Sequence, residues 1–383
     1  MNNPTTTPGR DLRIDFFRGL ALVMIFVNHL PYSPLSLATL RNWGLSDSAE
    51  VFVLLAGVAA ALAYSRIFEQ KGYLAGTRAV LARVRTLYGV HLLLFALIGV
   101  ICWLGAQALG DSSYLGIFGY APFFEEPLRR LPEALALMFQ PGYLDILPLY
   151  VVLLGFIPLL IPLYRLHMLA PLVVSLVLYA AMQWAPLHLP NTVQDGGVWF
   201  FNPFAWQVLF VIGFTMGQMI RSPKARPALP NALRHTITAF AAFYTALAML
   251  VVGPWREIPG WENAWLVDPN LLAVANKSLL HPLRLFDILT KVWLVAQLIP
   301  ASSAWLHSML ARPVVAMGRH SLPIFATSTV LAVGGGMVIE ALPEIPLSVA
   351  VNTVGILLML GAGLYADMRR KPARAKDQAG VAL

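Results

Sequence analysis

The chain has 383 residues, of which 58% are hydrophobic and only 12% are charged, and its formal net charge is +8. Soluble globular proteins carry about 25% charged residues, so this composition excludes that class and indicates an integral membrane protein. The basic residues lie in short loops between apolar runs, which indicates membrane topology and argues against a nucleic-acid-binding patch. The single cysteine, Cys102, excludes an intramolecular disulfide and a cysteine-based zinc site, and we predict no metal site.

The fold is predicted to be all-α, a polytopic membrane protein of about ten transmembrane helices. The fourth segment is rich in proline, which predicts kinks, and the ninth is rich in glycine. The first segment contains Arg18 and ends in NHLPYSPL instead of the small-residue cleavage site of a signal peptide. We therefore expect this segment to be retained as a helix and not cleaved. The segments are 14–32, 48–65, 86–109, 145–164, 168–186, 203–220, 235–254, 282–300, 320–340 and 346–366.

Charges in the connecting loops predict the orientation. Of the 27 basic residues, 18 fall in the termini and loops of one side, and six fall on the other side. By the positive-inside rule, both termini are then cytoplasmic, which agrees with an even number of spans. We predict one membrane domain over 1–370 and a disordered cytoplasmic tail over 371–383, where the sequence is polar.

The longest loops, 110–144, 187–202 and 255–281, fall on the outer side and are rich in aromatic residues, carboxylates and amides. Such residues are typical of a sugar-binding surface and equally of an interfacial aromatic belt. Trp206 and Gln207, near the outer end of the sixth segment, are candidates for contact with a polar ligand.

The first apolar segment, RIDFFRGLALVMIFVNHLP at 13–31, contains the ionisable residues Asp15, Arg18 and His29. An Asp or Arg at the centre of a membrane helix costs about 2.5–3.5 kcal/mol on insertion scales. Arg18 and His29 are separated by a rise of about 16–17 Å and three turns, so both project from one face, and Asp15 is close enough to pair with Arg18. This face lines a cavity or packs against protein. The alternatives are a snorkelling Asp–Arg staple and a histidine that only bonds its neighbour.

The second segment begins with LSDSAEVF, which places Asp47 and Glu50 in its first turn, at about the depth of His29. A carboxylate beside an imidazole fixes its tautomer and raises its basicity, as a general base requires. The alternative is helix capping by Ser46 or Asp47, with Glu50 completing a capping box. Asp47 is the better cap and is kept as a candidate substrate contact, whereas Glu50 is the candidate catalytic partner of His29.

Two further sets of charged residues are candidates for substrate binding. Asp287 and Lys291 lie four residues apart on one face of the eighth segment and could pair with each other. Such a pair either locks the structure or forms a polar wall of a transport pathway. Arg319 and His320, in GRHSLPIF at the cytoplasmic start of the ninth segment, are placed to contact an anionic ligand. A histidine at such a helix start is also commonly just solvated.

Together these residues resemble a known family. Arg18 followed after ten residues by His29 resembles the membrane acyltransferase-3 superfamily, and the match is closer to its OpgC branch. The phrase VLLAGVAA departs from the family, which more often has a serine before the glycine, and this puts a hydroxyl role there in doubt. The resemblance runs through RDLRIDFFRGLALVMIFVNH, AEVFVLLAGVAAALAYSR, DILPLYVVLLG, FNPFAWQVLFVIGF and MGRHSLPIF, in order along nearly the whole chain.

The resemblance implies transfer of a succinyl group from cytosolic succinyl-CoA to a glucose hydroxyl of periplasmic glucans, in the inner membrane of a Gram-negative bacterium. It implies no tightly bound cofactor, since succinyl-CoA or another acyl-CoA is a co-substrate. His29 is placed to act as the base for the hydroxyl, and Arg18 to bind the phosphates of CoA or the succinyl carboxylate. An acyl-histidine intermediate stays open, as does the oligomeric state.

Two other functions stay open. One is an acyltransferase with a different donor or acceptor, such as acetyl groups on surface polysaccharide. The other is an ion-coupled transporter, in which the charges of the first helix and the pair Asp287–Lys291 form a pathway. No internal repeat of the kind common in transporters is detectable.

Overall fold

The computed structural model describes residues 11–222, 229–257 and 274–380, and over these residues the chain forms helices and no β-strand, which confirms the predicted all-α class. Each predicted span corresponds to a helix, and the fourth corresponds to two. These helices are α1 (Leu12–His29), α2 (Ser48–Lys71), α3 (Tyr73–Leu109), α7 (Ile146–Gly155) with α8 (Ile157–Leu166), α9 (Ala170–Trp184), α10 (Pro203–Arg221), α11 (Asn231–Val251), α13 (Pro282–Leu298), α15 (Ser321–Ala341) and α16 (Ile345–Gly380).

Six of the described helices are long and apolar enough to cross a membrane, or seven if the bent pair α7 and α8 is one span. These six are α2, α3, α10, α11, α15 and the part of α16 from Ile345 to Arg369. Of the other expected spans, α1 contains three charged residues, and α9 and α13 have only 15 and 17 residues. The chain is therefore an all-helical membrane protein, whereas ten spans and cytoplasmic termini stay predictions. α16 continues to Gly380, into the region expected to be a disordered tail, and residues 381–383 lie outside the described residues.

Shorter elements connect these helices. Between α3 and α7 lie α4 (Ser113–Ile117), α5 (Ala121–Glu125) and α6 (Pro127–Leu135). The α1–α2 connection contains η1 (Pro34–Ala38) and η2 (Leu40–Asn42), η4 (Pro254–Glu257) follows α11, and η5 (Ala304–His307) and α14 (Ala311–Arg319) precede α15. The predicted kink of the fourth span is confirmed, because α7 and α8 meet at 41°. Pro158, in the first turn of α8, has no N–H to continue the helical hydrogen bonds.

Glycines let two pairs of helices approach backbone to backbone. A Cβ on Gly57 of α2 would lie 2.1 Å from the carbonyl oxygen of Phe210, and one on Gly213 of α10 would lie 2.0 Å from that of Leu54. α1 approaches α14 as closely, since a Cβ on Gly318 would lie 1.7 Å from the backbone oxygen of Asp15. Small residues at such contacts are typical of helix packing in membranes, where dispersion replaces the hydrophobic effect.

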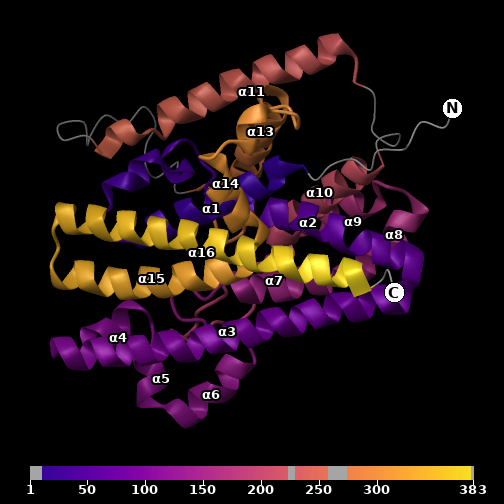
Figure 1. Ribbon diagram of the computed structural model, residues 1–383. Coiled ribbons are helices and arrows are strands. Elements are labelled where there is room, and N and C mark those ends of the chain that lie inside the picture. The colour runs from indigo at the N-terminus through magenta and orange to yellow at the C-terminus, as the bar shows by residue number, and fades with distance from the viewer. Residues whose placement is uncertain (1–10, 223–228, 258–273, 381–383) are drawn as a thin grey trace.

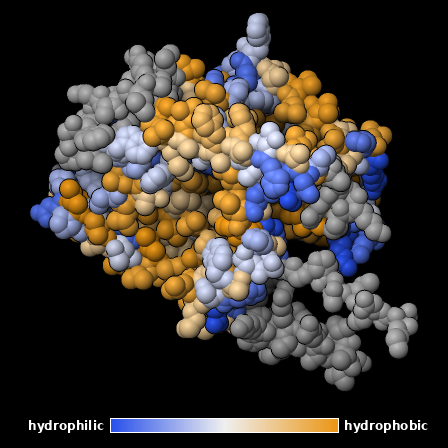
Figure 2. Space-filling model, turned by 90° about the horizontal axis from the view of Figure 1, so that it is seen from above, coloured by the Kyte–Doolittle hydropathy of each residue, from blue (hydrophilic) through white to orange (hydrophobic). Residues whose placement is uncertain are grey.

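Figure 1 shows α15 and α16 side by side and antiparallel, with α3 running below them and α11 crossing the opposite side of the molecule. Hydrophobic side chains cover much of the face shown in Figure 2, with hydrophilic groups gathered toward its edges. This distribution is typical of a protein whose sides face lipid.

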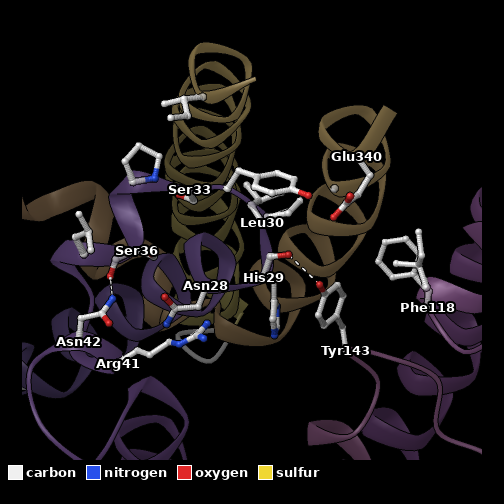
Figure 3. Close-up of a pocket in the computed structure, with 17 residues that line it drawn as sticks. Asn28, His29, Leu30, Ser33, Ser36, Arg41, Asn42, Phe118, Tyr143 and Glu340 are labelled. Carbon is white, nitrogen blue, oxygen red and sulfur yellow. Dashed lines mark hydrogen bonds between the residues drawn. The ribbon is translucent and has the colours of Figure 1, made fainter. Parts of the chain in front are cut away.

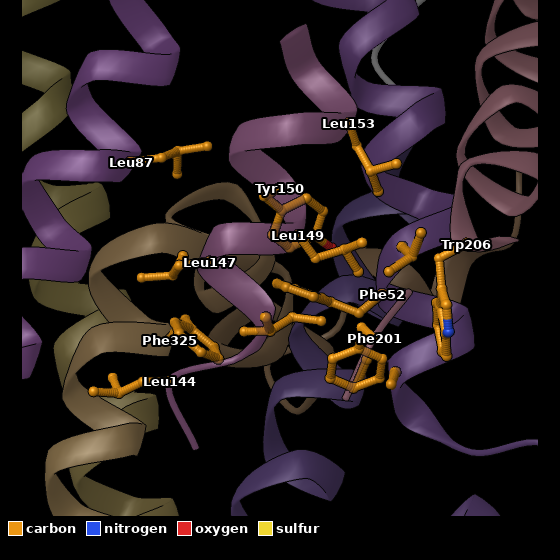
Figure 4. Packing of buried hydrophobic residues seen from close by; sticks show 14 of the residues in the cluster. Phe52, Leu87, Leu144, Leu147, Leu149, Tyr150, Leu153, Phe201, Trp206 and Phe325 are labelled. Carbon is orange, nitrogen blue, oxygen red and sulfur yellow. The ribbon is translucent and has the colours of Figure 1, made fainter. Parts of the chain in front are cut away.

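Aromatic residues fill the centre of the bundle. The ring of Phe52 from α2 meets that of Tyr150 from α7 edge to face, with centroids 5.6 Å apart, and it stacks on Phe325 of α15 at 6.4 Å. Figure 4 shows these rings among the leucines of α7. This packing fixes α2, α7 and α15 relative to one another, and these elements and α1 carry the candidate site.

Candidate functional site

The C-terminal end of α1 is bound to the loop before α7. The last carbonyl groups of a helix have no intrahelical donor, and the hydroxyl of Tyr143 donates to the carbonyl oxygen of His29 over 2.9 Å. The two rings are stacked, with centroids 4.0 Å apart and planes at 29°. Tyr143 has a φ of 68°, a left-handed conformation that is costly for a bulky side chain. The fold therefore holds Tyr143 in a strained position against His29.

A cavity of about 600 Å³ opens at this end of α1. Its volume is within the range of about 300–1,000 Å³ that is usual for small-molecule sites. The imidazole of His29 makes no hydrogen bond to a protein group within the described ranges, so its nitrogen atoms are open to a ligand. Figure 3 shows His29 between Arg41 on one side and Tyr143 and Glu340 on the other. The polar and aromatic residues lining the cavity include Asn28, His29, Arg41, Phe118, Tyr143 and Glu340.

The two carboxylates at the start of α2 are paired with cations from a distant part of the chain. Asp47 caps the helix through the N–H of Ala49 and binds the ammonium of Lys277 at 2.5 Å. Glu50, fully buried, accepts from the N–H of Asp47 over 3.0 Å and binds the guanidinium of Arg284 at 2.6 Å. The capping box that we weighed as an alternative is therefore present. No hydrogen bond joins Glu50 to His29 within the described residues, so the expected pairing of these two is not found.

Lys277 is the cation of this cluster whose charge reaches the C-terminal end of α1. Burial alone would raise the pKa of Asp47, but the charges of Lys277 and Arg284 outweigh burial and hold that pKa below its ordinary value. The charge of Lys277 also acts on His29 and on Asp145, just before α7. His29 thus lies within electrostatic reach of Lys277 and Asp47, whose charges are opposite.

Near the N-terminal end of α1, Asp15 and Arg18 contact the junction of α14 and α15. Asp15 is buried, and its carboxylate lies 3.6 Å from Nε of Arg319, which is therefore an ion-pair partner that spacing along the helix does not predict. Arg18 donates to Oγ of Ser321 over 2.5 Å. The charge of Arg18 also acts on the buried Tyr150 hydroxyl. Arg18 and His29 thus face the same bundle interior from the two ends of one helix.

A further carboxylate, Asp367 of α16, completes this cluster at the N-terminal end of α1. It binds Arg319 at 3.2 Å and lies 3.5 Å from Nε2 of His320. The structure therefore brings the predicted residues Asp15, Arg319 and His320 into one cluster, which joins α1, α14 and α16.

The predicted pair Asp287–Lys291 is present and buried in α13. The two side chains form a short ion pair, and Asp287 also accepts from both the N–H and the hydroxyl of Ser46, at 2.7 and 2.5 Å. Gly44 lies directly over the pair, since a Cβ there would be 2.6 Å from the ammonium of Lys291. Of the two alternatives, these contacts favour the structural lock, which holds the α1–α2 connection against α13.

Trp206 and Gln207 do not line the cavity at His29. The indole N–H of the buried Trp206 donates to the carbonyl oxygens of Lys277 and Ser278, both at 3.1 Å. Gln207 accepts from the hydroxyl of Ser175 over 2.6 Å and donates to its carbonyl over 2.9 Å, which ties α10 to α9. Their polar atoms therefore have protein partners, and ligand contact by either residue stays a prediction without support from the geometry.

Sequence reasoning missed the residues that come to the site from loops and helix ends. Tyr143, Glu340 and Arg41 line the cavity, and Lys277 and Asp367 complete the two charged clusters. The sequence held one usable signal, because Glu340 is an acidic residue at the end of an apolar segment. Asp367 follows the last apolar segment within α16, and the others belong to polar connections in which no periodicity marks them.

A comparison with protein families gives a match over nearly the whole chain. The family described as OpgC protein matches residues 10–371. This range covers both ends of α1, the cavity at His29 and the charged cluster at Arg319. No curated protein and no solved structure matches the chain.

Proposed function

Since the chain belongs to the OpgC family and is therefore a membrane transferase, we propose that it moves a succinyl group from cytosolic succinyl-CoA to glucose hydroxyls of periplasmic glucans, in the bacterial inner membrane. The observation that carries this proposal is the imidazole of His29, which has no protein hydrogen-bond partner among the described residues and lines an open cavity. Arg18, about 16–17 Å away along the same helix, supports the choice of a long donor.

In the proposed reaction, a glucan hydroxyl in the outer cavity attacks the thioester carbonyl of succinyl-CoA. His29 accepts the hydroxyl proton as the new ester bond forms. The carbon–sulfur bond then breaks, and the CoA thiolate leaves with the proton that His29 returns. The stacked ring of Tyr143 limits rotation of the imidazole, so that its position does not depend on a partner carboxylate.

Arg18 is the proposed contact for the donor. Its guanidinium fork matches the geometry of a phosphate or carboxylate, and it contacts Ser321, which follows Arg319 and His320 in the chain, so that Arg319 adds a second positive charge to this region. Asp15 and Asp367 offset part of this charge and orient Arg319. The distance from Arg18 to His29 is comparable with the length of a pantetheine arm.

The test uses cells that lack this protein and are complemented with wild type, His29→Gln or His188→Ala. His188 is an exposed histidine of the 187–202 loop and is the matched control. Periplasmic glucans are separated by anion exchange and weighed by mass spectrometry. We expect the deletion to lose the succinyl mass increment, wild type and His188→Ala to restore it, and His29→Gln to fail although it is stably expressed. A deletion that leaves the glucan charge unchanged would refute the acceptor.

Ion-coupled transport is less well supported, because the ion pair Asp287–Lys291 has the backbone and hydroxyl of Ser46 as further partners. Substrate flux that persists in His29→Gln without any dependence on acyl-CoA would favour transport over transfer.

A further inference from the structure

Two oppositely charged side chains that the proposed reaction does not use line the same cavity as His29. Glu340 comes from the last turn of α15, and Arg41 comes from η2 in the α1–α2 connection. Neither makes a hydrogen bond or an ion pair with any residue in the described part of the chain. Glu340 is half-buried and Arg41 is exposed, so both charges are accessible from the cavity.

Glu340 lies close to the ring that stacks on His29. Burial raises the pKa of Tyr143, and the negative charge of Glu340 raises that pKa further, which places the carboxylate within electrostatic reach of the Tyr143 hydroxyl. Figure 3 shows Glu340 on the same side of the cavity as Tyr143, with Arg41 beyond His29 on the other side. His29, Glu340 and Arg41 therefore line one cavity, with His29 between the two charges in this view.

The chemistry of the walls selects among ligand classes. A lipid chain would leave both charges desolvated and unpaired, which is costly. An anionic ligand would be repelled by Glu340, and a cationic one by Arg41. A neutral polyol satisfies both, because each hydroxyl donates to a carboxylate and accepts from a guanidinium. The rings of Phe118 and Tyr143, with centroids 5.8 Å apart, add an apolar surface for the C–H face of a sugar.

We propose that Glu340 and Arg41 form the acceptor subsite, in which Glu340 accepts hydrogen bonds from hydroxyls of a neutral sugar ring and Arg41 donates to its oxygens, so that another hydroxyl is presented to His29. This inference rests on the proposed function for the identity of the acceptor as a glucan. Both are binding and positioning residues, and the proton transfer remains that of His29.

The test measures binding directly on the full-length protein purified in detergent. Unsubstituted glucan from the deletion strain is titrated by isothermal calorimetry into wild type, Glu340→Gln and Glu344→Gln. Glu344 is an exposed carboxylate of the α15–α16 connection that does not line the cavity, so it is the matched control. We expect Glu340→Gln to weaken glucan binding by about tenfold to a hundredfold, as for the loss of one charged hydrogen bond, and Glu344→Gln to bind like wild type.

The same comparison applies to the cation. Arg41→Gln is expected to weaken binding by a similar factor, whereas Arg129→Gln, which removes an exposed arginine paired with Glu126 on α6, is expected to have no effect. In succinyl-transfer assays, Glu340→Gln and Arg41→Gln should raise the KM for glucan and leave the KM for succinyl-CoA unchanged. A general loss of structure would change both KM values and the melting temperature.

The outcomes separate the two proposals. Glucan affinity and glucan KM in Glu340→Gln equal to those of wild type overturn the subsite, while the function still stands if His29→Gln abolishes transfer. Glucan binding that depends on Glu340 in a protein that transfers no succinyl group supports the subsite and overturns the reaction. Wild type that binds no unsubstituted glucan overturns the subsite whatever the variants do.

Discussion

Replacing Lys291 by methionine is expected to destabilise the protein strongly, because it leaves the carboxylate of Asp287 without its cation. Asp287 is 0% exposed and Lys291 is 8% exposed, so water does not take the place of the ammonium. Removing one partner of a buried ion pair costs about 3–5 kcal/mol. At about 2 °C for each kcal/mol in a large protein, the melting temperature should fall by about 6–10 °C. Thermal unfolding of the purified protein in detergent, followed by tryptophan fluorescence, measures this change.

A second variant and a control test the reason for the loss. Asp287→Asn combined with Lys291→Met removes both charges, keeps an oxygen that accepts from Ser46, and should recover more than half of the lost stability. Lys71→Met, at the exposed end of α2, should change the melting temperature by no more than about 2 °C. The reasoning fails if Lys291→Met behaves like Lys71→Met, or if the double variant is as unstable as the single one.

The remaining predictions concern packing, pH and the contact at the end of α1. Gly213→Ala forces a methyl group against the backbone of α2 and should cost about 1–3 kcal/mol in a thermal assay, whereas Gly89→Ala, with no atom within 4 Å, should be neutral or stabilising. The hydrogen bond from Thr192 and the charge of a neighbouring arginine lower the pKa of Glu133 on α6 in the folded protein. The contact therefore stabilises the folded protein above about pH 4.5, the ordinary pKa of glutamate, and this stabilisation is lost as the pH falls through the lowered pKa. Hydrogen exchange of the 187–202 loop should show this acid-dependent opening in wild type and none in Glu133→Gln. Tyr143→Phe keeps the stacked ring but loses its hydroxyl bond, which should lower the melting temperature by about 1–3 °C, and Tyr143→Leu should lower it further.

The sequence predicts well those features that interrupt an apolar pattern. Asp15, Arg18 and His29 stand out because charged and polar groups in a membrane segment are costly, and the structure places them at the two ends of one helix. The pair Asp287–Lys291 is predictable for the same reason. Its members are four residues apart, so they lie on the same face of a helix and can pair.

Contacts between distant segments account for what the sequence could not predict. Glu50 was predicted to face His29, but its cation is Arg284, more than 200 residues away, and no local pattern marks that pairing. Asp367 reaches Arg319 for the same reason. Hydropathy also predicts more membrane spans than the described helices support by their length and composition. One reason is that α9 and α13 are apolar but short.

The close backbone contact between α1 and α14 fixes the position of α1 in the bundle. With no space for even a methyl group between Gly318 and the backbone of Asp15, α1 cannot slide past its neighbour without breaking that contact. The position of α1 is therefore fixed, and its length sets the separation between Arg18 toward one end and His29 at the other. A transporter that alternates between two conformations would move α1. An enzyme in which α1 stays fixed needs a substrate long enough to reach from one end of the helix to the other. The proposed donor must therefore be long enough to reach from Arg18 to His29.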